Sequence, residues 1–407
     1  MTLKSLIDPS TGEILDQALI CYFQAPHSFT GEDVVELHCH GSPVMLRRLI
    51  DLALSLDARL ADPGEFSLRA VSNGRLRLTE AEAIRDLIHA QTEEAARQAT
   101  RQMKGEISHL LQPVKERLLS IIVRLESSLE FVEDDLPALE HDEMLAALQQ
   151  TRSELSRLAG TFSSGKLLRD GIKVAFLGRP NVGKSSLFNM LVGHGRAIVT
   201  DIPGTTRDTL TEWIDFDGVP VMLIDTAGIR AATDAIETMG VERARREAVD
   251  ADLLVVVLDG AEPLNPDDQI VLDETDKARR IIAFNKSDLP TFSTSTFPAT
   301  SITSKVVSVS AKTETGLEQL RAAILESFRN RGAVDEGLLI TNARHYDLLL
   351  RSSRAVESSQ ALLCARASEE LILIGLHNAL SYLGELTGET TPDEILGRIF
   401  STFCVGK

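Results

Sequence analysis

The stretch 178–185, Gly-Arg-Pro-Asn-Val-Gly-Lys-Ser, has the residue types and spacing of a phosphate-binding loop. It follows the apolar run 172–177 and precedes a helical pattern at 186–191, the order of strand, loop and helix that a phosphate cradle requires. Glycines let backbone N–H groups converge on phosphate oxygens, and the helix N-terminus adds positive potential. Lys184 can reach the β- and γ-phosphates, and the Ser185 hydroxyl can bind Mg²⁺. The stretch therefore predicts binding of a nucleoside triphosphate.

Two later motifs predict which base is bound. The apolar run 281–284 ends in Asn285-Lys286-Ser287-Asp288, whose aspartate can accept two hydrogen bonds from N1–H and the exocyclic amine of guanine. Adenine offers an acceptor at N1 and no amine at C2, so it would leave the carboxylate unpaired. Ser310-Ala311-Lys312 follows a β-rich run at 306–309 and is typical of a loop that closes over the base. The base is therefore predicted to be guanine.

Two motifs between these predict a switch. The apolar run 221–224 leads into Asp225-Thr226-Ala227-Gly228, where the acidic residue can hold the Mg²⁺ shell and the glycine N–H can sense the γ-phosphate. Upstream, Gly-Thr-Thr-Arg-Asp at 204–208 offers a threonine hydroxyl as a second protein ligand to Mg²⁺. Loops that the γ-phosphate orders and hydrolysis releases are the basis of a GTPase switch. The four motifs in this order predict GTP binding and hydrolysis.

One position departs from the Ras pattern. Ile229 follows Asp-Thr-Ala-Gly at the place where Ras-like proteins have the glutamine that positions water. An apolar side chain cannot orient water, so another group must do so. Arg230, Asp234 and Glu237 are the nearby polar candidates, and spacing alone does not choose among them.

Composition restricts the class of protein. A length of 407 residues predicts two or three domains, and the net charge of −18 argues against a general electrostatic nucleic-acid binder, although a local basic surface remains compatible with it. The four cysteines form no C-x-x-C pair, which predicts a reducing compartment and argues against zinc ribbons and disulfide frameworks. The sequence has neither an apolar run of transmembrane length nor a signal peptide, so we expect a soluble cytoplasmic protein.

The segments that position these motifs differ in character. We expect a small α+β domain at 1–73, helical segments at 74–168 and 331–407, and a Ras-like α/β P-loop GTPase domain at 169–330. Apolar residues recur at helical spacing in both flanks, so the simplest architecture is one all-α domain built from two sequence segments, with the GTPase domain inserted. Two separate helical bundles are the alternative.

Two other features allow more than one interpretation. His38 and His40 would share one face of a strand, but no third metal ligand is placed by spacing, so a strand end that enters a turn is favoured. Cys404 lies close to the C-terminus, where a reactive thiol and a passive cysteine on a frayed end are both compatible with the position. The residues alone favour the passive cysteine.

Taken together, the motifs resemble those of the MnmE (TrmE) family of bacterial and organellar tRNA modification GTPases. The resemblance extends over nearly the whole chain and includes Phe-Thr-Gly-Glu-Asp at 29–33, Pro-Gly-Glu-Phe at 63–66, Ile-Pro-Gly-Thr-Thr-Arg-Asp at 202–208 and Cys-Val-Gly-Lys at 404–407. It implies that the chain works with an FAD-containing partner of the MnmG type on certain tRNAs. The pair would add an aminomethyl or carboxymethylaminomethyl group at C5 of the wobble uridine, with the carbon supplied by 5-formyl- or methylene-tetrahydrofolate.

The resemblance also implies an assembly and a set of ligands. It implies a homodimer through the N-terminal domain, a heterotetramer with the flavoprotein, and two GTPase domains that K⁺ brings face to face. K⁺ would be held by Asn181, Thr200, Ile202 and Thr205, Mg²⁺ by Ser185 and Thr206, and folate by Glu36, Arg75 and Lys407. Glu237 would orient the attacking water, and Cys404 would supply a thiol for modification rather than for hydrolysis.

The motifs and the resemblance together define the expected GTP contacts. They are Asn181, Val182, Gly183, Lys184, Ser185, Ser186, Thr200, Asp201, Ile202, Pro203, Gly204, Thr205, Thr206, Asp225, Thr226, Ala227, Gly228, Asn285, Lys286, Asp288, Ser310, Ala311 and Lys312.

Two departures from the family pattern concern folate. Family members begin several tens of residues earlier, with a glycine-rich segment carrying an arginine that helps to hold folate, so we expect a shortened N-terminal domain here. Arg75 stands where a lysine is usual, which keeps the charge and changes the hydrogen-bond geometry.

Two rival hypotheses have different consequences. A GTP-gated ribosome assembly factor of the Era/EngA group would have an RNA-binding KH-like domain after the GTPase domain, whereas a helical, non-basic segment follows here. An inert scaffold would hydrolyse GTP without any function in modification.

Overall fold

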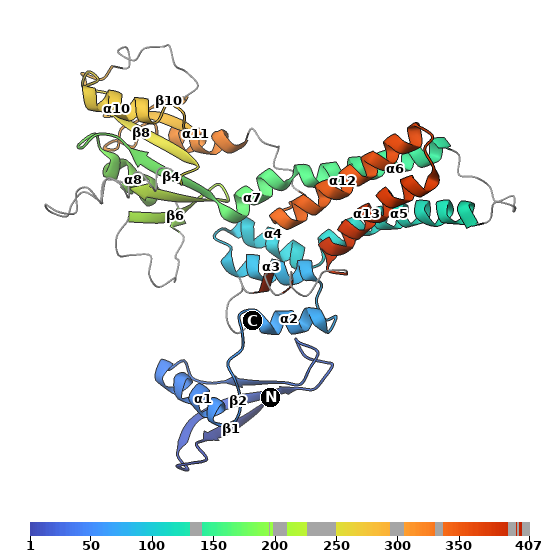
Figure 1. Ribbon diagram of the computed structural model, residues 1–407. Helices are drawn as coiled ribbons and strands as arrows, with labels where there is room; N and C mark the ends of the chain where they lie inside the picture. The colour runs from blue at the N-terminus through green and yellow to red at the C-terminus, as the bar shows by residue number, and fades with distance from the viewer. Residues whose placement is uncertain are drawn as a thin grey trace. The chain divides into compact units, whose positions relative to one another are not determined.

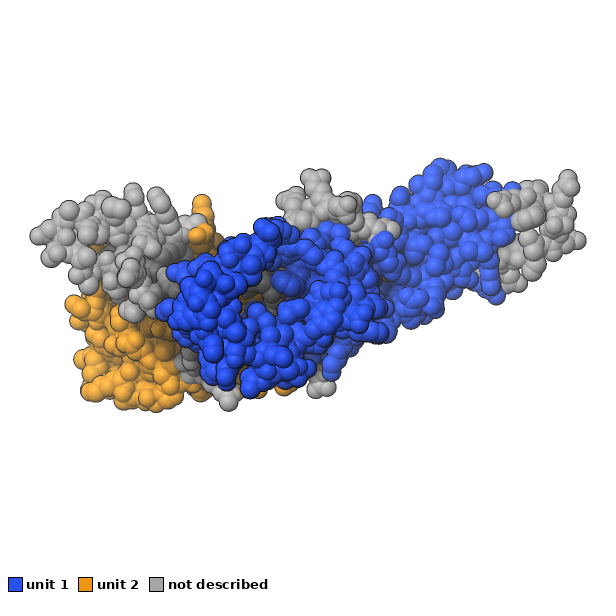
Figure 2. All heavy atoms as spheres, turned by 90° about the horizontal axis from the view of Figure 1, so that it is seen from below, with its two compact units in different colours: residues 1–88, 99–153, 351–407 blue, residues 89–98, 154–350 orange. Residues whose placement is uncertain are grey.

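A computed structural model of the chain describes residues 1–130, 141–194, 196–197, 210–225, 250–293, 305–329, 337–389, 396 and 399–400. The chain divides into two compact units, which Figure 2 colours separately. Unit 1 comprises residues 1–88, 99–153 and 351–407, and unit 2 comprises residues 89–98 and 154–350.

Unit 1 begins with a small antiparallel sheet. Strands β1 (Thr2–Ile7), β2 (Ile14–Phe23) and β3 (Val34–His38) pair in that order, and α1 (Pro43–Ser55) lies against β2. The turn between β1 and β2 contains Asp-Pro-Ser-Thr-Gly at 8–12, residue types that favour turns. There the backbone N–H of Ser10 donates to the Asp8 carboxylate at 2.9 Å, and Gly12 has a φ of +73°. Helices α2 (Glu65–Ser72) and α3 (Leu78–His89) follow. The predicted α+β character of this region is confirmed.

The rest of unit 1 is helical and joins segments that lie far apart in the sequence (Figure 1). Helix α5 (Glu106–Glu130) packs against α13 (Glu369–Thr387), where Nε2 of His377 lies 3.0 Å from Oε1 of Glu126. Between α6 (His141–Gly160) and α12 (Ala343–Cys364), Arg152 donates to Glu357 at 2.9 Å. The prediction of one helical domain built from two segments is therefore confirmed, and the alternative of two separate bundles is wrong.

The residues described beyond α13 add to the core of unit 1. The Phe400 side chain is 1% exposed and packs with Leu78 and Ala81 of α3, beside Leu68 and Val71 of α2. An aromatic ring buried in this way anchors the chain a few residues before Cys404. None of the helices in the described part of the chain is long and apolar enough to cross a membrane.

Unit 2 contains a seven-stranded mixed sheet in the order β10-β9-β8-β4-β7-β6-β5 within the described residues (Figure 1). The parallel strands are β4 (Ile172–Leu177), β7 (Val219–Asp225), β8 (Leu253–Asp259), β9 (Arg280–Asn285) and β10 (Lys305–Ser308). Strand β6 (Leu210–Phe216) runs antiparallel to β7, and β5 (Arg196–Ala197) runs antiparallel to β6. All residues of β8 and β9 are buried, as expected of parallel strands that are covered on both faces.

Of the two strands in the β6–β7 hairpin, the sequence pattern predicts only the second. Asp217 and Gly218 form its turn with φ values of +53° and +88°, and positive values at both positions suit a two-residue hairpin. Asp-Gly after an alternating run, with Ile214 and Phe216 buried, is the signal that could have identified it. Oγ1 of Thr92, just before α4 (Glu93–Met103), donates to the Gly218 carbonyl at 2.8 Å.

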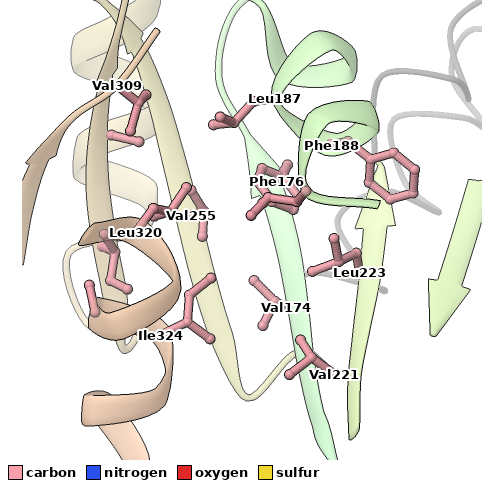
Figure 3. Close-up of a cluster of buried hydrophobic side chains, with 14 of the residues drawn as sticks. Val174, Phe176, Leu187, Phe188, Val221, Leu223, Val255, Val309, Leu320 and Ile324 are labelled. Carbon is pink, nitrogen blue, oxygen red and sulfur yellow. The ribbon is translucent and has the colours of Figure 1, made fainter. Parts of the chain in front are cut away.

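Helices cover both faces of this sheet. Helices α8 (Lys184–His194) and α11 (Leu317–Arg329) share one face, where Leu187, Leu320 and Ile324 pack with Val174 and Val255 (Figure 3). On the other face, Leu272 of α10 (Pro266–Glu274) joins a second apolar cluster with strands β8 and β9. Helix α7 (Phe162–Asp170) precedes the central strand β4. Burial of each such side chain contributes about 1.5–3 kcal/mol. This is the predicted Ras-like α/β architecture.

Candidate nucleotide-binding site

The described parts of the predicted motifs lie at one edge of the sheet. The phosphate loop, residues 178–183, follows β4, Asp225 ends β7 and Asn285 ends β9, while Ser310 comes two residues after β10. The carboxyl ends of parallel strands meet at the same edge, which is where open α/β sheets bind their ligands. The order of these strands in the sheet therefore brings together motifs that are more than one hundred residues apart.

The phosphate loop depends on two of its glycines. A Cβ on Gly178 would lie 2.3 Å from the Val257 carbonyl oxygen, and a Cβ on Gly183 would lie 2.2 Å from Nδ2 of Asn285. Gly183 also has a φ of +94°, which side chains rarely allow. These close approaches explain why the loop needs glycine at both ends.

Lys184 begins helix α8 directly after this loop. Its side chain is 8% exposed, and Nζ donates to the carbonyl oxygens of Gly178 at 2.9 Å and Arg179 at 2.8 Å. Ser185 and Ser186 follow at exposed positions in the first turn of α8, where the helix N-terminus favours anions. An ammonium and two hydroxyls are thus placed where a triphosphate would meet the loop.

Asn285 connects the loops of the site. Its Nδ2 donates to the Val182 carbonyl at 2.8 Å, and its Oδ1 accepts from the backbone N–H of Ala311 at 3.0 Å. Both Asn285 and Val182 are buried. The predicted base-reading motif is therefore bonded directly to the predicted phosphate loop.

Asp288 of the predicted base motif is held by a hydrogen bond from Ser310. Oγ of Ser310, which is buried, donates to Oδ1 of Asp288 at 2.7 Å, and this hydrogen bond lowers the pKa of the Asp288 carboxyl. Asp288 and Lys312 are exposed. A carboxylate that stays ionised and faces solvent can accept the two donors of guanine.

Two charged residues that the sequence analysis does not assign to the site lie beside it. Asp259 ends β8 with a side chain that is 2% exposed, and Lys286 of the base motif donates to it at 2.5 Å. Arg179 of the phosphate loop is the second cation near this carboxylate. The position of Asp259 was itself a signal, because it occupies on β8 the place that Asp225 and Asn285 occupy on their strands.

The metal ligands are described in part. The Asn181 and Ser185 side chains are exposed, with Asn181 in the left-handed region at φ +64°, and Asp225 is fully buried at the end of β7. Amide, hydroxyl and carboxylate oxygens suit hard cations such as Mg²⁺ and K⁺, so these residues fit the predicted ions. The remaining predicted site residues lie outside the described ranges. They are Thr200, Asp201, Ile202, Pro203, Gly204, Thr205, Thr206, Thr226, Ala227, Gly228, Glu237, Cys404 and Lys407.

The two described residues of the folate prediction, Glu36 and Arg75, have different partners. Glu36 lies 3.2 Å from His38 on strand β3. Arg75 donates from Nε to the Ser28 carbonyl at 3.2 Å, and its Cγ would lie 3.1 Å from a Cβ on Gly31. Arg75 therefore packs against the loop that contains Phe-Thr-Gly-Glu-Asp.

The His38-Cys39-His40 stretch is a strand end. Strand β3 ends at His38, and Nδ1 of His40 lies 2.7 Å from Oδ1 of Asp16. In the part of the chain that the structure describes, no group of three or more His, Cys, Asp or Glu residues is arranged to hold a metal ion. The interpretation as a strand end that enters a turn agrees with this geometry.

Comparisons with known proteins cover nearly the whole chain. A family model described as the MnmE helical domain matches residues 78–404, and one described as the GTP-binding protein TrmE N-terminus matches residues 1–75. The tRNA modification GTPase MnmE of Koribacter versatilis is 44% identical over 99% of this chain and 88% of its own length. The protein of the same name from Aquifex aeolicus is 42% identical over 97% of this chain and 88% of its own.

A solved structure aligns with part of the chain. The G domain of the T. maritima FeoB iron transporter is 29% identical over 38% of this chain and 98% of that one, with a TM-score of 0.29.

Proposed function

Because the chain belongs to the MnmE family of tRNA modification GTPases, we propose that it works with a flavoprotein partner of the MnmG type on the wobble uridine of certain tRNAs. The pair adds an aminomethyl or carboxymethylaminomethyl group at C5, using a carbon from a tetrahydrofolate derivative. The observation that best supports this proposal is the similarity to MnmE proteins along nearly the entire chain. The placement of the predicted phosphate and guanine motifs at one edge of the sheet agrees with it.

The described residues can bind GTP through two kinds of contact. Lys184 and the backbone N–H groups of residues 181–183 offer positive potential to the β- and γ-phosphates. The Asp288 carboxylate accepts two hydrogen bonds from guanine, while Asn285 and Ser310 hold the base-reading residues in place. ATP lacks both donors, so the site selects GTP.

Hydrolysis needs compensation for charge on the phosphoryl oxygens and an oriented water. Mg²⁺ and K⁺ supply this compensation when they are bound. In the proposal, Glu237 orients the water. Ser185 and Thr206 hold Mg²⁺, and Asn181, Thr200, Ile202 and Thr205 hold K⁺. K⁺ held by these residues would bring the GTPase domains of the two subunits of a homodimer face to face.

Modification uses other residues of the same chain. In the proposal, Glu36, Arg75 and Lys407 hold the folate, and the Cys404 thiol acts in modification without any role in GTP hydrolysis. The subunits pair through their N-terminal domains, and the flavoprotein completes a heterotetramer in the cytoplasm.

Wobble-uridine analysis tests the proposal. In a bacterial strain that lacks its own gene of this family, mass spectrometry of tRNA nucleosides should show the modification restored by the wild-type chain. Asp288→Ala should restore neither GTP hydrolysis nor the uridine modification. Cys404→Ser should hydrolyse GTP normally and leave the uridine unmodified. Active GTP hydrolysis by the wild type with unaltered wobble nucleosides would instead favour the assembly-factor or inert-GTPase hypothesis.

The cation and the water-orienting residue need separate measurements. GTP turnover should be far slower in Na⁺ than in K⁺, and it should rise with protein concentration because dimer formation activates it. Glu237→Ala should bind GTP as the wild type does and hydrolyse it much more slowly. Equal rates in the two salts would remove Asn181 from its proposed role, and lost GTP binding in Glu237→Ala would indicate a structural residue.

A further inference from the structure

Asp259 is a buried carboxylate with three partners. Its Oδ1 accepts from the backbone N–H of Ala261 at 3.0 Å. Its Oδ2 accepts from Nζ of Lys286 at 2.5 Å, and Nη2 of Arg179 lies 3.9 Å from the same oxygen. With 2% of the Asp259 side chain exposed, water screens these charges weakly.

The two cations around Asp259 come from different ligand-binding loops. Arg179 is the second residue of the phosphate loop, and its carbonyl oxygen accepts a hydrogen bond from Nζ of Lys184. Lys286 is the second residue of the base-reading motif, between Asn285 and the residues that lead to Asp288. A single carboxylate on β8 is therefore shared by the phosphate side and the guanine side of the site.

The two cations do not depend on Asp259 to the same extent. Arg179 also donates to Glu262 at 2.6 Å, and its Nε lies 3.3 Å from Oδ1 of Asp268, which is 2% exposed. In the described residues, the ion pair of Lys286 is with Asp259. Lys286 moreover has a φ of +66°, a left-handed conformation that is uncommon for lysine and that its neighbours must hold.

We propose that Asp259 is a positioning residue that holds Lys286, and through it the guanine-reading loop, in register with the phosphate loop. Asp259 does this without touching the nucleotide. The proposal rests on nucleotide binding at the site described above, and it adds a determinant of base selectivity that lies outside the sequence motifs.

Replacement by asparagine separates charge from shape. In Asp259→Asn, the oxygen of the new amide can still accept from the Ala261 N–H, so the turn after β8 keeps its bond. The amide nitrogen would then face the Lys286 ammonium. Both groups are hydrogen-bond donors, so Lys286 would lose its acceptor. Arg179 keeps Glu262 and Asp268, so the guanine side should loosen more than the phosphate side.

The dissociation rates of fluorescently labelled GDP and IDP from the full chain test this asymmetry. IDP lacks the exocyclic amine that Asp288 reads, so the ratio of the two dissociation rates, taken as the preference for GDP over IDP, reports on the base-reading loop. For Asp259→Asn we expect GDP to dissociate about tenfold faster and the preference for GDP over IDP to fall about threefold. Glu262→Gln is the matched control, because Glu262 pairs with Arg179 and not with Lys286, and its side chain is 60% exposed. The GDP dissociation rate and the preference for GDP over IDP should therefore stay within about twofold of the wild-type values.

A double-mutant cycle with Lys286→Met distinguishes positioning from a general loss of stability. If Asp259 acts through Lys286, the effects of the two substitutions on the GDP dissociation rate will be strongly non-additive. The melting temperature of the nucleotide-free protein will not change in parallel with that rate. Should Asp259→Asn fail to fold, Asp259→Glu, which displaces the carboxylate by one methylene, should still lower the GDP preference.

Three results decide the matter. Additive effects, or an unchanged preference for GDP over IDP in the variant that folds, would overturn the role of Asp259. Absence of GDP binding by the wild-type chain would instead contradict the nucleotide site itself.

Discussion

Asn285 donates a hydrogen bond of 2.8 Å from Nδ2 to the carbonyl oxygen of Val182. Through its other amide atom, Asn285 accepts from the backbone N–H of Ala311 at 3.0 Å. Three loops, each following a different strand of the sheet, therefore meet at one buried amide. In the proposed site, these contacts connect the loop that would bind the phosphates with the loops that would read the base.

Asn285→Ala should uncouple these loops. The substitution leaves the buried Val182 carbonyl without its partner, at a cost of about 1–3 kcal/mol, and also removes the partner of the partly buried Ala311 N–H. We expect GDP affinity to fall by about 100-fold or more, measured by titration with a fluorescent nucleotide. Asn189→Ala, at an exposed asparagine of α8, is the control and should bind GDP normally. A loss of less than threefold in Asn285→Ala would show that the three loops are held together by other contacts.

Asp288→Asn should change which base is bound. Xanthine has a carbonyl at C2 where guanine has an amine, and an asparagine amide can donate to that carbonyl. We therefore expect GTP affinity to fall by about 100-fold, while affinity for xanthosine triphosphate rises above that of the wild type. Competition between the two nucleotides in one binding assay measures the change. Loss of affinity for both nucleotides would indicate that the Ser310–Asp288 hydrogen bond, and not the charge on Asp288, shapes the loop.

The placement of the nucleotide motifs could be predicted from the sequence for a simple reason. Each motif directly follows an apolar run, and strands that run parallel bring their following loops to one edge. Gly183, Asn285 and Asp288 therefore lie where local patterns place them. The helical periodicity of the two flanks is likewise a local property, and it predicted α5 and α13.

Contacts between those local pieces could not be predicted in the same way. The pairing of Asp259 with Lys286 depends on β8 lying beside β9, and no spacing between the two residues encodes this neighbourhood. The same holds for Arg75, which donates to the Ser28 carbonyl far earlier in the chain. Such contacts depend on strand order and helix packing, which a single sequence specifies only through the whole fold.

Glu65 makes the stability of the N-terminal region depend on pH. Hydrogen bonds from Arg59, from the backbone of Asp62 and from Arg69 lower the pKa of Glu65 from 4.5 to about 2. Since the pKa is lower in the folded state, the stabilisation is fully present above about pH 4.5 and is lost as the pH falls toward 2. Glu65→Gln should therefore be less stable than the wild type at pH 7, and the difference should narrow below pH 4.5.

The stability difference between the wild type and Glu65→Gln can be measured from urea unfolding midpoints at several pH values, with unfolding followed by hydrogen exchange of α2. Glu13→Gln serves as the comparison because it also removes a carboxylate bonded to an arginine, Arg48, but at a side chain that is 58% exposed. Its effect should be small at every pH. A difference for Glu65→Gln that stays constant from pH 7 to pH 3.5 would mean that the carboxylate charge does not stabilise this region.

Lys115 of the helical domain is a buried lysine whose apolar stem is expected to contribute more to stability than its charge. Its side chain is 8% exposed, and Nζ donates to Oγ1 of Thr387 at 2.9 Å and to Oε1 of Glu389 at 2.6 Å. Glu389 is 64% exposed and can be hydrated instead, while the Thr387 hydroxyl also donates to the Leu383 carbonyl. Removal of the ammonium therefore strands neither partner, and the apolar stem of Lys115 fills space between α5 and α13.

Lys115→Met keeps most of that volume, so we expect the free energy of unfolding to stay within about 1 kcal/mol of the wild-type value. Lys115→Ala removes the stem and should cost about 2 kcal/mol through the cavity that it leaves. Urea denaturation monitored by hydrogen exchange of α5 and α13 compares the two variants, because it reports on this helix pair rather than on the whole chain. If methionine proved as damaging as alanine, the ion pair with Glu389, and not the buried stem, would be what holds the end of α13 to α5.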